Sequence, residues 1–372
     1  MIGTRAAVLH KPDSPLSVET VEFEPPRAQE VLVRMVATAL CHSDLHNIKL
    51  AAYVPMIMGH EAAGVVEQIG TGVTTLVPGD KVLFTFVPSC GRCYFCLRGM
   101  AVDCERGSGM SGRGELLDGT YRARSADGTP VGQATRLGAF SERVVVHEDS
   151  CIKVPTDTEL RVASLLSCGF TTGAGAAINV AKTEIGDTVV VIGVGGVGTA
   201  AIQGALIAGA GEVIAVDIAE HKLESARRFG ATRTIDARGD WPRAIRDATG
   251  GHGADRALLC VGNISDEMVA GTVNAIRKGG TAVLVGATVG LTHLAVRPAG
   301  ALMVGHKIIT GTLYGSLDPR RDQLRFLDLY RAGRLKLAEM ITATYTLDQV
   351  NDGLADLAAG RNIRGVIEFT PS

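Results

Sequence analysis

Four cysteines between residues 90 and 104 are spaced closely enough to hold one metal ion. Cys90, Cys93, Cys96 and Cys104 form the pattern C-x2-C-x2-C-x7-C. Four thiolates at this spacing suit a closed tetrahedral zinc site, which leaves no position for a substrate and therefore has a structural role. A ferredoxin-type iron–sulfur run places its fourth cysteine about four residues after the third, followed by proline. Here Glu105 follows a longer gap, so zinc is favoured.

A second group of metal-ligating side chains is scattered along the chain. It consists of Cys41, the pair His60-Glu61, and Cys168. Two thiols and one imidazole, with a fourth position open, are a ligand set of catalytic zinc sites. Taken singly, each residue fits equally well as a small buried residue or as part of an ordinary surface, so the residues alone leave this second site open.

A glycine-rich motif in the middle of the chain indicates a dinucleotide site. The motif G-x-G-x-x-G consists of Gly193, Val194, Gly195, Gly196, Val197 and Gly198. It follows an apolar segment, opens another, and precedes Asp217 by the interval expected of a ribose-binding acid. The amides at the start of the following helix would bind the phosphates. The Asp217 carboxylate would accept ribose hydroxyls and repel a 2′-phosphate, which favours NAD over NADP; a glycine-rich turn without a ligand is the alternative.

Length and charge limit the classes of protein to which the chain can belong. Its 372 residues suggest about two domains. A hydrophobic share of 46% excludes a disordered chain. A net charge of −2 gives no basic surface for nucleic acid or for an anionic membrane. The 46 glycines exceed the usual share without a Gly-X-Y period, so collagen is excluded and many tight turns are expected.

One uncharged segment is long enough to span a membrane but lacks the other features of a membrane span. Residues 188–211 carry no charge, yet four glycines interrupt them and no basic or aromatic anchors flank them. We therefore expect a buried strand that runs into a buried helix. The first residues lack the apolar stretch of a signal peptide. We expect a cytoplasmic protein, in which thiols stay reduced and serve as ligands before they form disulfides.

The elements that must position these residues follow two different patterns along the chain. Residues 1–155 contain short β-branched runs separated by turn residues, whereas strands and helices alternate from about residue 184, which predicts a parallel, doubly wound sheet. The predicted strands are 31–40, 64–70, 80–87, 140–148, 187–193, 212–217, 254–262, 280–286 and 364–370, and the predicted helical segments are 197–209, 221–230, 274–279 and 319–333.

The motifs, taken in order, resemble those of the zinc-dependent alcohol dehydrogenases of the medium-chain dehydrogenase/reductase superfamily. They are CHSDLH (41–46), GHEAAG (59–64), the four-cysteine spacing, SCGF (167–170) and GVGGVG (193–198). The resemblance covers essentially the whole chain. It implies an α/β fold with a GroES-like, β-rich catalytic domain (1–169 and 313–372) and a Rossmann NAD-binding domain (170–312).

The resemblance also implies roles for residues around the second metal group. Cys41, His60 and Cys168 would bind the catalytic zinc, which brings the count to two zinc ions per subunit. Asp44 would hydrogen-bond to His60 and fix its tautomer, and Glu61 would be a transient ligand. The remaining catalytic residues would be the proton relay Ser43 and His46.

Further positions match cofactor and substrate contacts of the family. His42 and Arg364 would contact the cofactor pyrophosphate, Thr172 the nicotinamide, and Lys222 the adenosine ribose. Phe86 falls at a substrate-pocket position, and Ser43 would also line this pocket. Tyr53 adds to a mainly apolar pocket, although Tyr53 and Phe86 fit a core equally well.

The implied activity is reversible hydride transfer from a primary alcohol (allylic, aromatic or medium-chain) to NAD, which gives an aldehyde. The resemblance is to bacterial nicotinoprotein-type and mycothiol-dependent members, so a thiol-dependent formaldehyde dehydrogenase is the alternative. The acid and base that glutathione-dependent members use are missing from 47–58 and 107–112. Whether the cofactor exchanges stays open.

One rival from another class remains, a catalytically silent NAD-binding protein, and it is a remote one. A zinc-ribbon nucleic-acid binder is excluded, because it needs a basic patch and the cysteine loop offers only Arg92 and Arg98. The long segment 105–138 resembles that of dimeric family members and predicts a homodimer.

Overall fold

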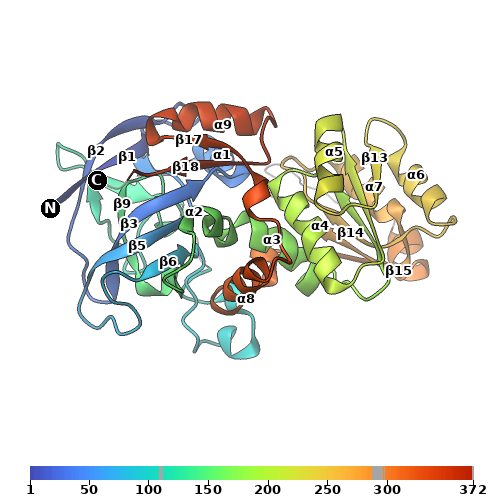
Figure 1. Cartoon of the computed structure of the whole chain (residues 1–372), viewed down its shortest axis with the longest axis horizontal. Coiled ribbons are helices and arrows are strands. Elements are labelled where there is room, and N and C mark those ends of the chain that lie inside the picture. Colours follow the sequence, from blue (N-terminus) through green and yellow to red (C-terminus); the bar gives the residue numbers. More distant parts are fainter. Residues whose placement is uncertain (109–111, 287–295, 297, 371–372) are drawn as a thin grey trace. The chain divides into compact units, whose positions relative to one another are not determined.

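The computed structural model describes residues 1–108, 112–286, 296 and 298–370, and it divides into two compact units (Figure 1). Residues 109–111 of the segment 105–138 lie outside this description. The first unit contains Met1–Cys168, Asp318–Ala332 and Leu337–Ser372. The second contains Gly169–Leu317 and Gly333–Lys336.

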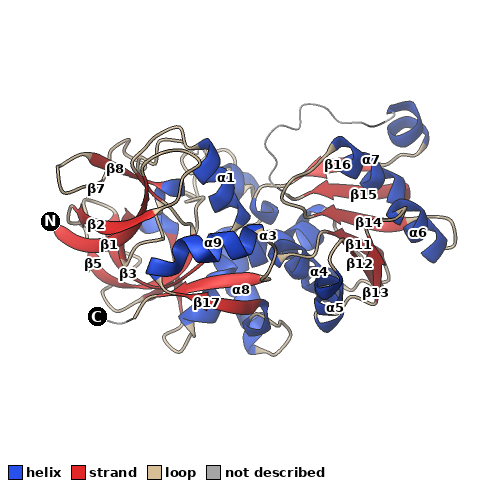
Figure 2. Cartoon of the chain, turned by 90° about the horizontal axis from the view of Figure 1, so that it is seen from above, coloured by secondary structure: helices blue, strands red, loops and turns tan. Residues whose placement is uncertain are grey.

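The first unit combines a small closed barrel with a larger sheet (Figure 2). The barrel runs in the order β1-β2-β7-β8-β4, and the sheet in the order β10-β6-β5-β3-β18-β17, with β9 also paired to β3. The barrel strands are β1 (Ile2–Leu9), β2 (Ser17–Phe23), β4 (Met56–Ile57), β7 (Ala123–Arg124) and β8 (Pro130–Gln133). The sheet strands are β3 (Glu30–Ala39), β5 (Glu61–Ile69), β6 (Lys81–Phe84), β9 (Arg143–His147), β10 (Cys151–Val154), β17 (Ile341–Tyr345) and β18 (Arg364–Glu368).

Helix α8 of the first unit begins at a recognisable cap. Asp318 accepts a hydrogen bond from the first turn of α8, and Pro319 opens that helix with its fixed φ. The α-helices are α1 (His42–Leu50), α2 (Leu160–Ala163), α8 (Pro319–Arg331) and α9 (Val350–Ala358). The 3-10 turns are η1 (Cys96–Arg98), η2 (Ala101–Asp103), η3 (Ala134–Arg136), η4 (Glu148–Ser150), η5 (Ser164–Ser167), η9 (Ala338–Met340) and η10 (Leu347–Gln349).

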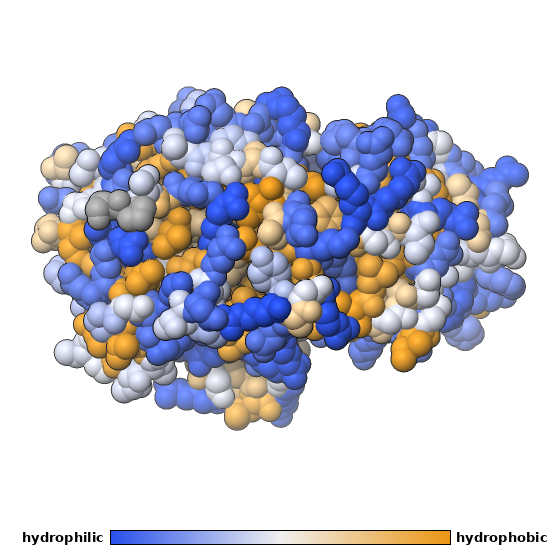
Figure 3. Space-filling model, viewed as in Figure 1, coloured by the Kyte–Doolittle hydropathy of each residue, from blue (hydrophilic) through white to orange (hydrophobic). Residues whose placement is uncertain are grey.

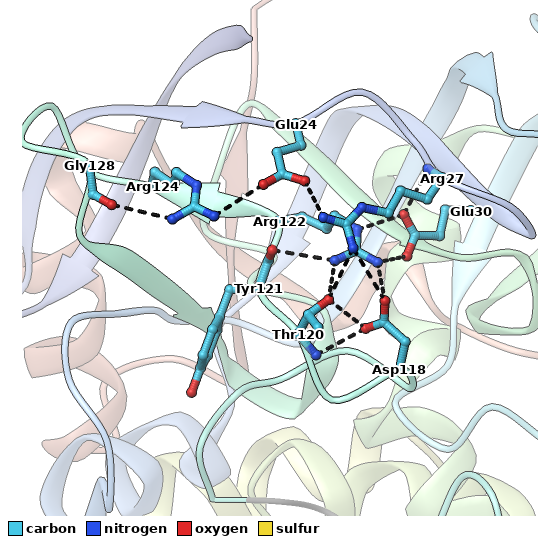
Figure 4. Close-up of polar contacts among 9 residues, drawn as sticks. All are labelled: Glu24, Arg27, Glu30, Asp118, Thr120, Tyr121, Arg122, Arg124 and Gly128. Atoms are coloured by element: carbon cyan, nitrogen blue, oxygen red, sulfur yellow. Dashed lines mark hydrogen bonds and ion pairs between the residues drawn. The ribbon is translucent and has the colours of Figure 1, made fainter.

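A buried ion cluster fastens the start of β3 to the hairpin that follows the cysteine loop (Figure 4). The Arg122 guanidinium, 1% exposed, donates two hydrogen bonds of 2.8 and 2.6 Å to the carboxylate of Glu30. It also donates to Asp118 and to Thr120 at 2.5 Å each. Because the partners surround it, Arg122 keeps its charge although it is removed from water. The cluster therefore holds one end of the strand whose other end leads to Cys41.

The second unit is a parallel sheet in the order β13-β12-β11-β14-β15-β16. Successive strand residues point to opposite faces, so Val189 and Val191 pack with α4 and α5, while Val190 and Ile192 pack with α6 and α7 (Figure 2). The strands are β11 (Thr188–Ile192), β12 (Glu212–Asp217), β13 (Arg233–Asp236), β14 (Ala254–Leu259), β15 (Ile276–Leu284) and β16 (Ile308–Gly311).

Helices cover both faces of this sheet, as in a doubly wound fold. They are α3 (Gly169–Gly175), α4 (Gly196–Ala208), α5 (Glu220–Arg228), α6 (Trp241–Ala248) and α7 (Asp266–Ala275), with π-helical turns η6 (Ala176–Val180) and η7 (Pro298–Val304) and the 3-10 turn η8 (Tyr314–Ser316). The predicted fold class is confirmed.

Two sequence predictions about single segments meet different outcomes. Residues 188–211 form β11 and α4, as expected from their apolar run broken by glycines. The predicted helical segment 274–279 is wrong for its larger part, because α7 ends at Ala275 and β15 begins at Ile276.

In the part of the chain that the structure describes, no helix has the length and apolarity needed to cross a bilayer. The face in Figure 3 carries polar residues interspersed with apolar ones.

Candidate active site and metal centres

Strand pairing brings the first two predicted ligands together. Strand β3 ends at Ala39 and β5 begins at Glu61, and these two residues are direct partners in the antiparallel ladder. Cys41 lies just after β3 and His60 just before β5, so the ladder places both beside the same sheet end. Residues separated by 19 positions in the sequence therefore become neighbours through backbone hydrogen bonds.

Two local features bring His60 and Cys168 to the same place as Cys41. Gly59 has φ +92°, and a Cβ there would lie 2.4 Å from the Phe140 ring, so only glycine fits the turn that presents His60. Ser167 donates its hydroxyl to the carbonyl of Ala62 at 2.6 Å, which fastens the turn η5 to β5. The next residue is Cys168, and this anchor brings it to the same place.

The structure thus assembles a compact set of metal-ligating atoms. Cys41, His60, Glu61 and Cys168 each offer one atom, and these atoms all lie within 4.8 Å of one another. All four residues are buried. The Cys168 thiol donates to the Cys41 sulfur, and this bond lowers the pKa of Cys41 well below its ordinary value while it raises that of Cys168. A buried set of two sulfurs, one imidazole and one carboxylate has the donor chemistry of a zinc site.

Asp44 orients the imidazole. It is fully buried, and its Oδ1 lies 2.8 Å from Nδ1 of His60. Its other oxygen accepts the backbone N–H of Cys41 at 3.1 Å, which caps α1. The contact to Nδ1 leaves Nε2 of His60 for a metal, the arrangement in which a carboxylate fixes the tautomer of a ligating histidine.

Arg364 lies beside this cluster at the start of β18. Its guanidinium is 2% exposed, with Nη1 3.6 Å from the Glu61 carboxylate and 3.3 Å from the carbonyl of Leu40, to which it donates. Burial disfavours its charge, but Glu61 and the Cys41 sulfur outweigh that effect and raise the pKa of Arg364. The sequence predicted a pyrophosphate contact for this residue; in the structure its described ion pair is with Glu61.

Helix α1 carries the predicted relay residues. Ser43 and His46 are three positions apart, so both side chains lie on one side of the helix, and both are half-buried. The Nδ1 atom of His46 is buried and has no hydrogen-bond partner among the described residues. His42, the predicted pyrophosphate contact, is exposed at the first position of α1.

The two aromatic residues predicted to line a pocket lie in different surroundings. Phe86 is 7% exposed, and its ring stands perpendicular to that of His60 with centroids 5.7 Å apart. Tyr53 stacks on Tyr121 at 5.1 Å and donates its hydroxyl to the carbonyl of Pro130 at 3.1 Å. Phe86 therefore contacts a ligand candidate directly, whereas Tyr53 contacts the hairpin and packs against an apolar core cluster.

The four cysteines of residues 90–104 form a second cluster in the first unit. Their sulfurs all lie within 4.8 Å of one another. Backbone N–H groups point at the sulfurs: the N–H of Cys90 lies 3.3 Å from the Cys104 sulfur. Those of Cys96 and Glu105 lower the pKa of Cys93 to about 6. Four sulfurs that accept amide hydrogens fit a thiolate-bound zinc ion. Cys151 and Cys260 belong to neither cluster, and burial raises the pKa of both.

The glycine motif of the second unit has the geometry of a phosphate loop. Gly193 has φ +84°, and a Cβ on Gly198 would lie 1.9 Å from the Gly193 carbonyl oxygen, so the turn requires both glycines. A Cβ on Gly195, the N-cap of α4, would meet nothing within 4 Å. The open space in front of this helix end fits a phosphate group.

The remaining cofactor residues surround this loop. Asp217 ends β12 and accepts the N–H of Val194 at 2.8 Å, so the acid is attached to the loop itself. Gly196, Val197 and Gly198 form the first turn of α4. Lys222 is half-buried in α5, and Thr172 is half-buried in the first turn of α3.

The sequence did not predict three contributions to the metal cluster. They are the turn at Gly59, the hydrogen bond of Ser167 that anchors η5, and the ion pair of Arg364. Gly59 stands next to a predicted ligand, so its position was a usable signal. Ser167 and the Arg364–Glu61 pair act across 105 and 303 positions of sequence, and no local pattern indicates such contacts.

Comparison with known proteins gives a consistent result. Residues 27–156 match the family model "Alcohol dehydrogenase GroES-like domain", and residues 196–330 match "Zinc-binding dehydrogenase". The chain is 42% identical to an NDMA-dependent alcohol dehydrogenase of Amycolatopsis methanolica, over 98% of both chains. Among solved structures, an alcohol dehydrogenase zinc-binding domain protein from Burkholderia ambifaria matches with TM-score 0.93, 34% identity and 99% coverage of both chains. The benzyl alcohol dehydrogenase of Acinetobacter calcoaceticus matches with TM-score 0.92, 29% identity and 100% coverage of both.

Proposed function

The chain belongs to the zinc-binding alcohol dehydrogenase family of oxidoreductases, and from that premise we propose that it oxidises primary alcohols to aldehydes with NAD as hydride acceptor. Allylic, aromatic and medium-chain alcohols are the substrate class. The observation that carries the proposal is the buried set Cys41, His60 and Cys168 with an imidazole oriented by Asp44. A mainly apolar neighbour, Phe86, favours apolar alcohols over charged thiol adducts.

Cys41, His60 and Cys168 would hold a catalytic zinc ion, and the cysteines of residues 90–104 a structural one, two per chain. The catalytic ion would supply Lewis-acid polarisation of the alcohol hydroxyl. Asp44 keeps the proton of His60 on Nδ1, so that Nε2 is the ligating atom. Arg364 balances the negative charge of Glu61 beside this set.

The chain's own residues would remove the hydroxyl proton. Ser43 receives it first, and the imidazole of His46, which can both accept and donate a proton, passes it to solvent. Their i, i+3 spacing on α1 supports this role, because it puts both side chains on one side of the helix. In the second unit, the phosphate loop, Asp217, Lys222 and Thr172 would hold NAD, which accepts the hydride; Asp217 disfavours a 2′-phosphate.

A substrate screen tests the proposal. Purified protein is assayed with benzyl, allylic and medium-chain alcohols, once with free NAD and once with an artificial electron acceptor. Turnover with NAD supports an exchangeable cofactor, and turnover with the acceptor alone indicates a permanently bound one. Turnover restricted to formaldehyde with mycothiol would move the assignment to the thiol-dependent alternative. A fully zinc-loaded protein that is inactive in every arm would contradict the proposal.

We further propose that the protein is a cytoplasmic homodimer that forms through β16. This strand lies at the edge of the parallel sheet, and no described strand covers its outer side. Ile308 is 54% exposed, as are Met303 at 72% and Val304 at 65% on the preceding turn. An apolar edge strand exposes unpaired backbone groups, and pairing with a second copy about a twofold axis covers both.

Light scattering coupled to size exclusion tests the dimer. Ile308→Lys should give a monomer, because two lysines would meet across the twofold axis. Ile185→Lys, at a residue of the same unit that is 93% exposed, is the control and should leave the mass unchanged. A dimeric Ile308→Lys protein would place the interface elsewhere.

A further inference from the structure

Helices α3 and α4 approach each other without a side chain between them at one point. A Cβ on Gly173 would lie 2.1 Å from the carbonyl oxygen of Val197 and 2.8 Å from the backbone nitrogen of Ala201. Real Cβ atoms essentially never come closer than 3.0 Å to such atoms. Any side chain at position 173 would therefore push the two helices about 1 Å further apart.

The same close packing continues along α3. A Cβ on Gly204 of α4 would lie 2.5 Å from the Cα of Ala174, and one on Gly175 would lie 2.8 Å from the carbonyl oxygen of Gly315. Gly315 is in the left-handed turn η8, with φ +67°. Glycines thus let helix α3 pack closely against both α4 and η8.

The two helices carry opposite ends of the expected cofactor site. Val197 lies in the first turn of α4, beside the phosphate loop. Thr172, the predicted nicotinamide contact, directly precedes Gly173 in α3. The spacing of the helices at Gly173 therefore fixes how far the nicotinamide contact stands from the pyrophosphate contacts.

We infer that Gly173 is a positioning residue that sets the distance between the phosphate loop and Thr172, and so the place of the nicotinamide. This inference rests on the proposed use of NAD. A displacement of about 1 Å is enough to lower the rate of an aligned transfer by about a hundredfold. In this unit the expected adenosine and pyrophosphate contacts lie on α4, α5 and Asp217, so the binding of ADP-ribose reports on them separately from Thr172.

The test compares Gly173→Ala with two other glycine-to-alanine variants in the second unit. Gly204→Ala makes a smaller overlap on the same helix pair, so it reports the same effect if Gly173→Ala fails to fold. Gly239→Ala is the matched control, because a Cβ there meets nothing within 4 Å. Calorimetry on nucleotide-free protein measures binding of ADP-ribose and of NAD, and steady-state kinetics with an alcohol deuterated at its carbinol carbon measures the isotope effect.

For Gly173→Ala we expect ADP-ribose affinity within about twofold of wild type and NAD affinity weaker by about tenfold, the loss of about one hydrogen bond. The turnover number should fall by about a hundredfold with a larger deuterium isotope effect, because hydride transfer becomes the slow step. Gly204→Ala should show the same pattern more weakly, and Gly239→Ala none of it.

Two outcomes would overturn the inference, and they differ in what else they affect. A parallel loss of ADP-ribose and NAD affinity, or a lower melting temperature with an unchanged isotope effect, would show that Gly173 only stabilises the fold. A wild-type chain that neither binds NAD nor oxidises any alcohol would overturn the proposed function, and the inference with it.

Discussion

At the scale of single residues, the two oxygens of Asp44 couple the start of a helix to the orientation of a metal ligand. One oxygen accepts the N–H of Cys41 and the other holds Nδ1 of His60. Burial raises the pKa of Asp44, yet its two partners satisfy the carboxylate. Removing its charge should therefore affect the ligand more than the helix.

Asp44→Asn should weaken zinc binding at the catalytic site by about 10- to 100-fold, because the amide no longer fixes the His60 tautomer. Competition with a chromophoric chelator measures the affinity. Asp348→Asn, at a side chain that is 62% exposed, is the control. An unchanged zinc affinity in the Asp44→Asn protein would remove Asp44 from this role.

His46→Ala should lower turnover, since the relay loses the group that passes the proton to solvent. Added imidazole or another buffer base should restore part of the rate. The pH profile of kcat with and without the base is the measurement, and His252→Ala, at an exposed histidine, is the control. A pH profile identical to that of wild type would exclude His46 from the relay.

At the scale of elements, the Arg122 cluster holds two segments together by buried ion pairs rather than by apolar packing. Arg122→Met should lower the free energy of unfolding by about 3–5 kcal/mol, because the buried Glu30 carboxylate loses its partner. Arg124→Met is the matched control: its salt bridge to Glu24 is 3.2 Å long and its side chain is 39% exposed, so about 1 kcal/mol or less is expected. Chemical denaturation measures both, and equal losses would mean that burial does not decide the effect.

Local elements were predictable where the chain signals them locally. The β-branched run 31–40 and the strand–loop–helix run 187–209 match β3, β11 and α4 closely. Residues 274–279 are predicted from the sequence as a helix end, but Ile276 pairs with Ala254 of β14 and begins β15. Pairing between distant segments decides whether such a segment forms a helix or a strand, and the local sequence does not reveal that pairing. For the same reason Cys41 and His60 could be named only through the family resemblance, whereas the four closely spaced cysteines were readable directly.

At the scale of the whole molecule, two metal clusters should contribute differently to stability and activity. Cys104→Ser should reduce bound zinc from two ions towards one per chain and lower the melting temperature, because the loop 90–104 has little core of its own. Cys168→Ser should abolish turnover and leave the structural ion in place. Cys151→Ser, outside both clusters, is the control.

Elemental analysis with a thermal melt separates these variants. Full zinc content in the Cys104→Ser protein would contradict a structural zinc site. Equal effects of all three substitutions would show that any lost thiol destabilises the chain, irrespective of metal.

The order of the segments along the chain matters for biogenesis. Every sulfur of both clusters has been synthesised by Cys168, but β17 and β18, which complete the sheet beside Cys41, begin only at Ile341. A ribosome needs roughly 10–35 seconds to add the intervening residues, at about 5–20 per second. Until Arg364 on β18 has been made, Cys41 and Cys168 lack part of their final enclosure and are open to oxidation. Newly made chains should therefore form disulfide-linked aggregates when zinc is scarce, and early zinc capture protects them.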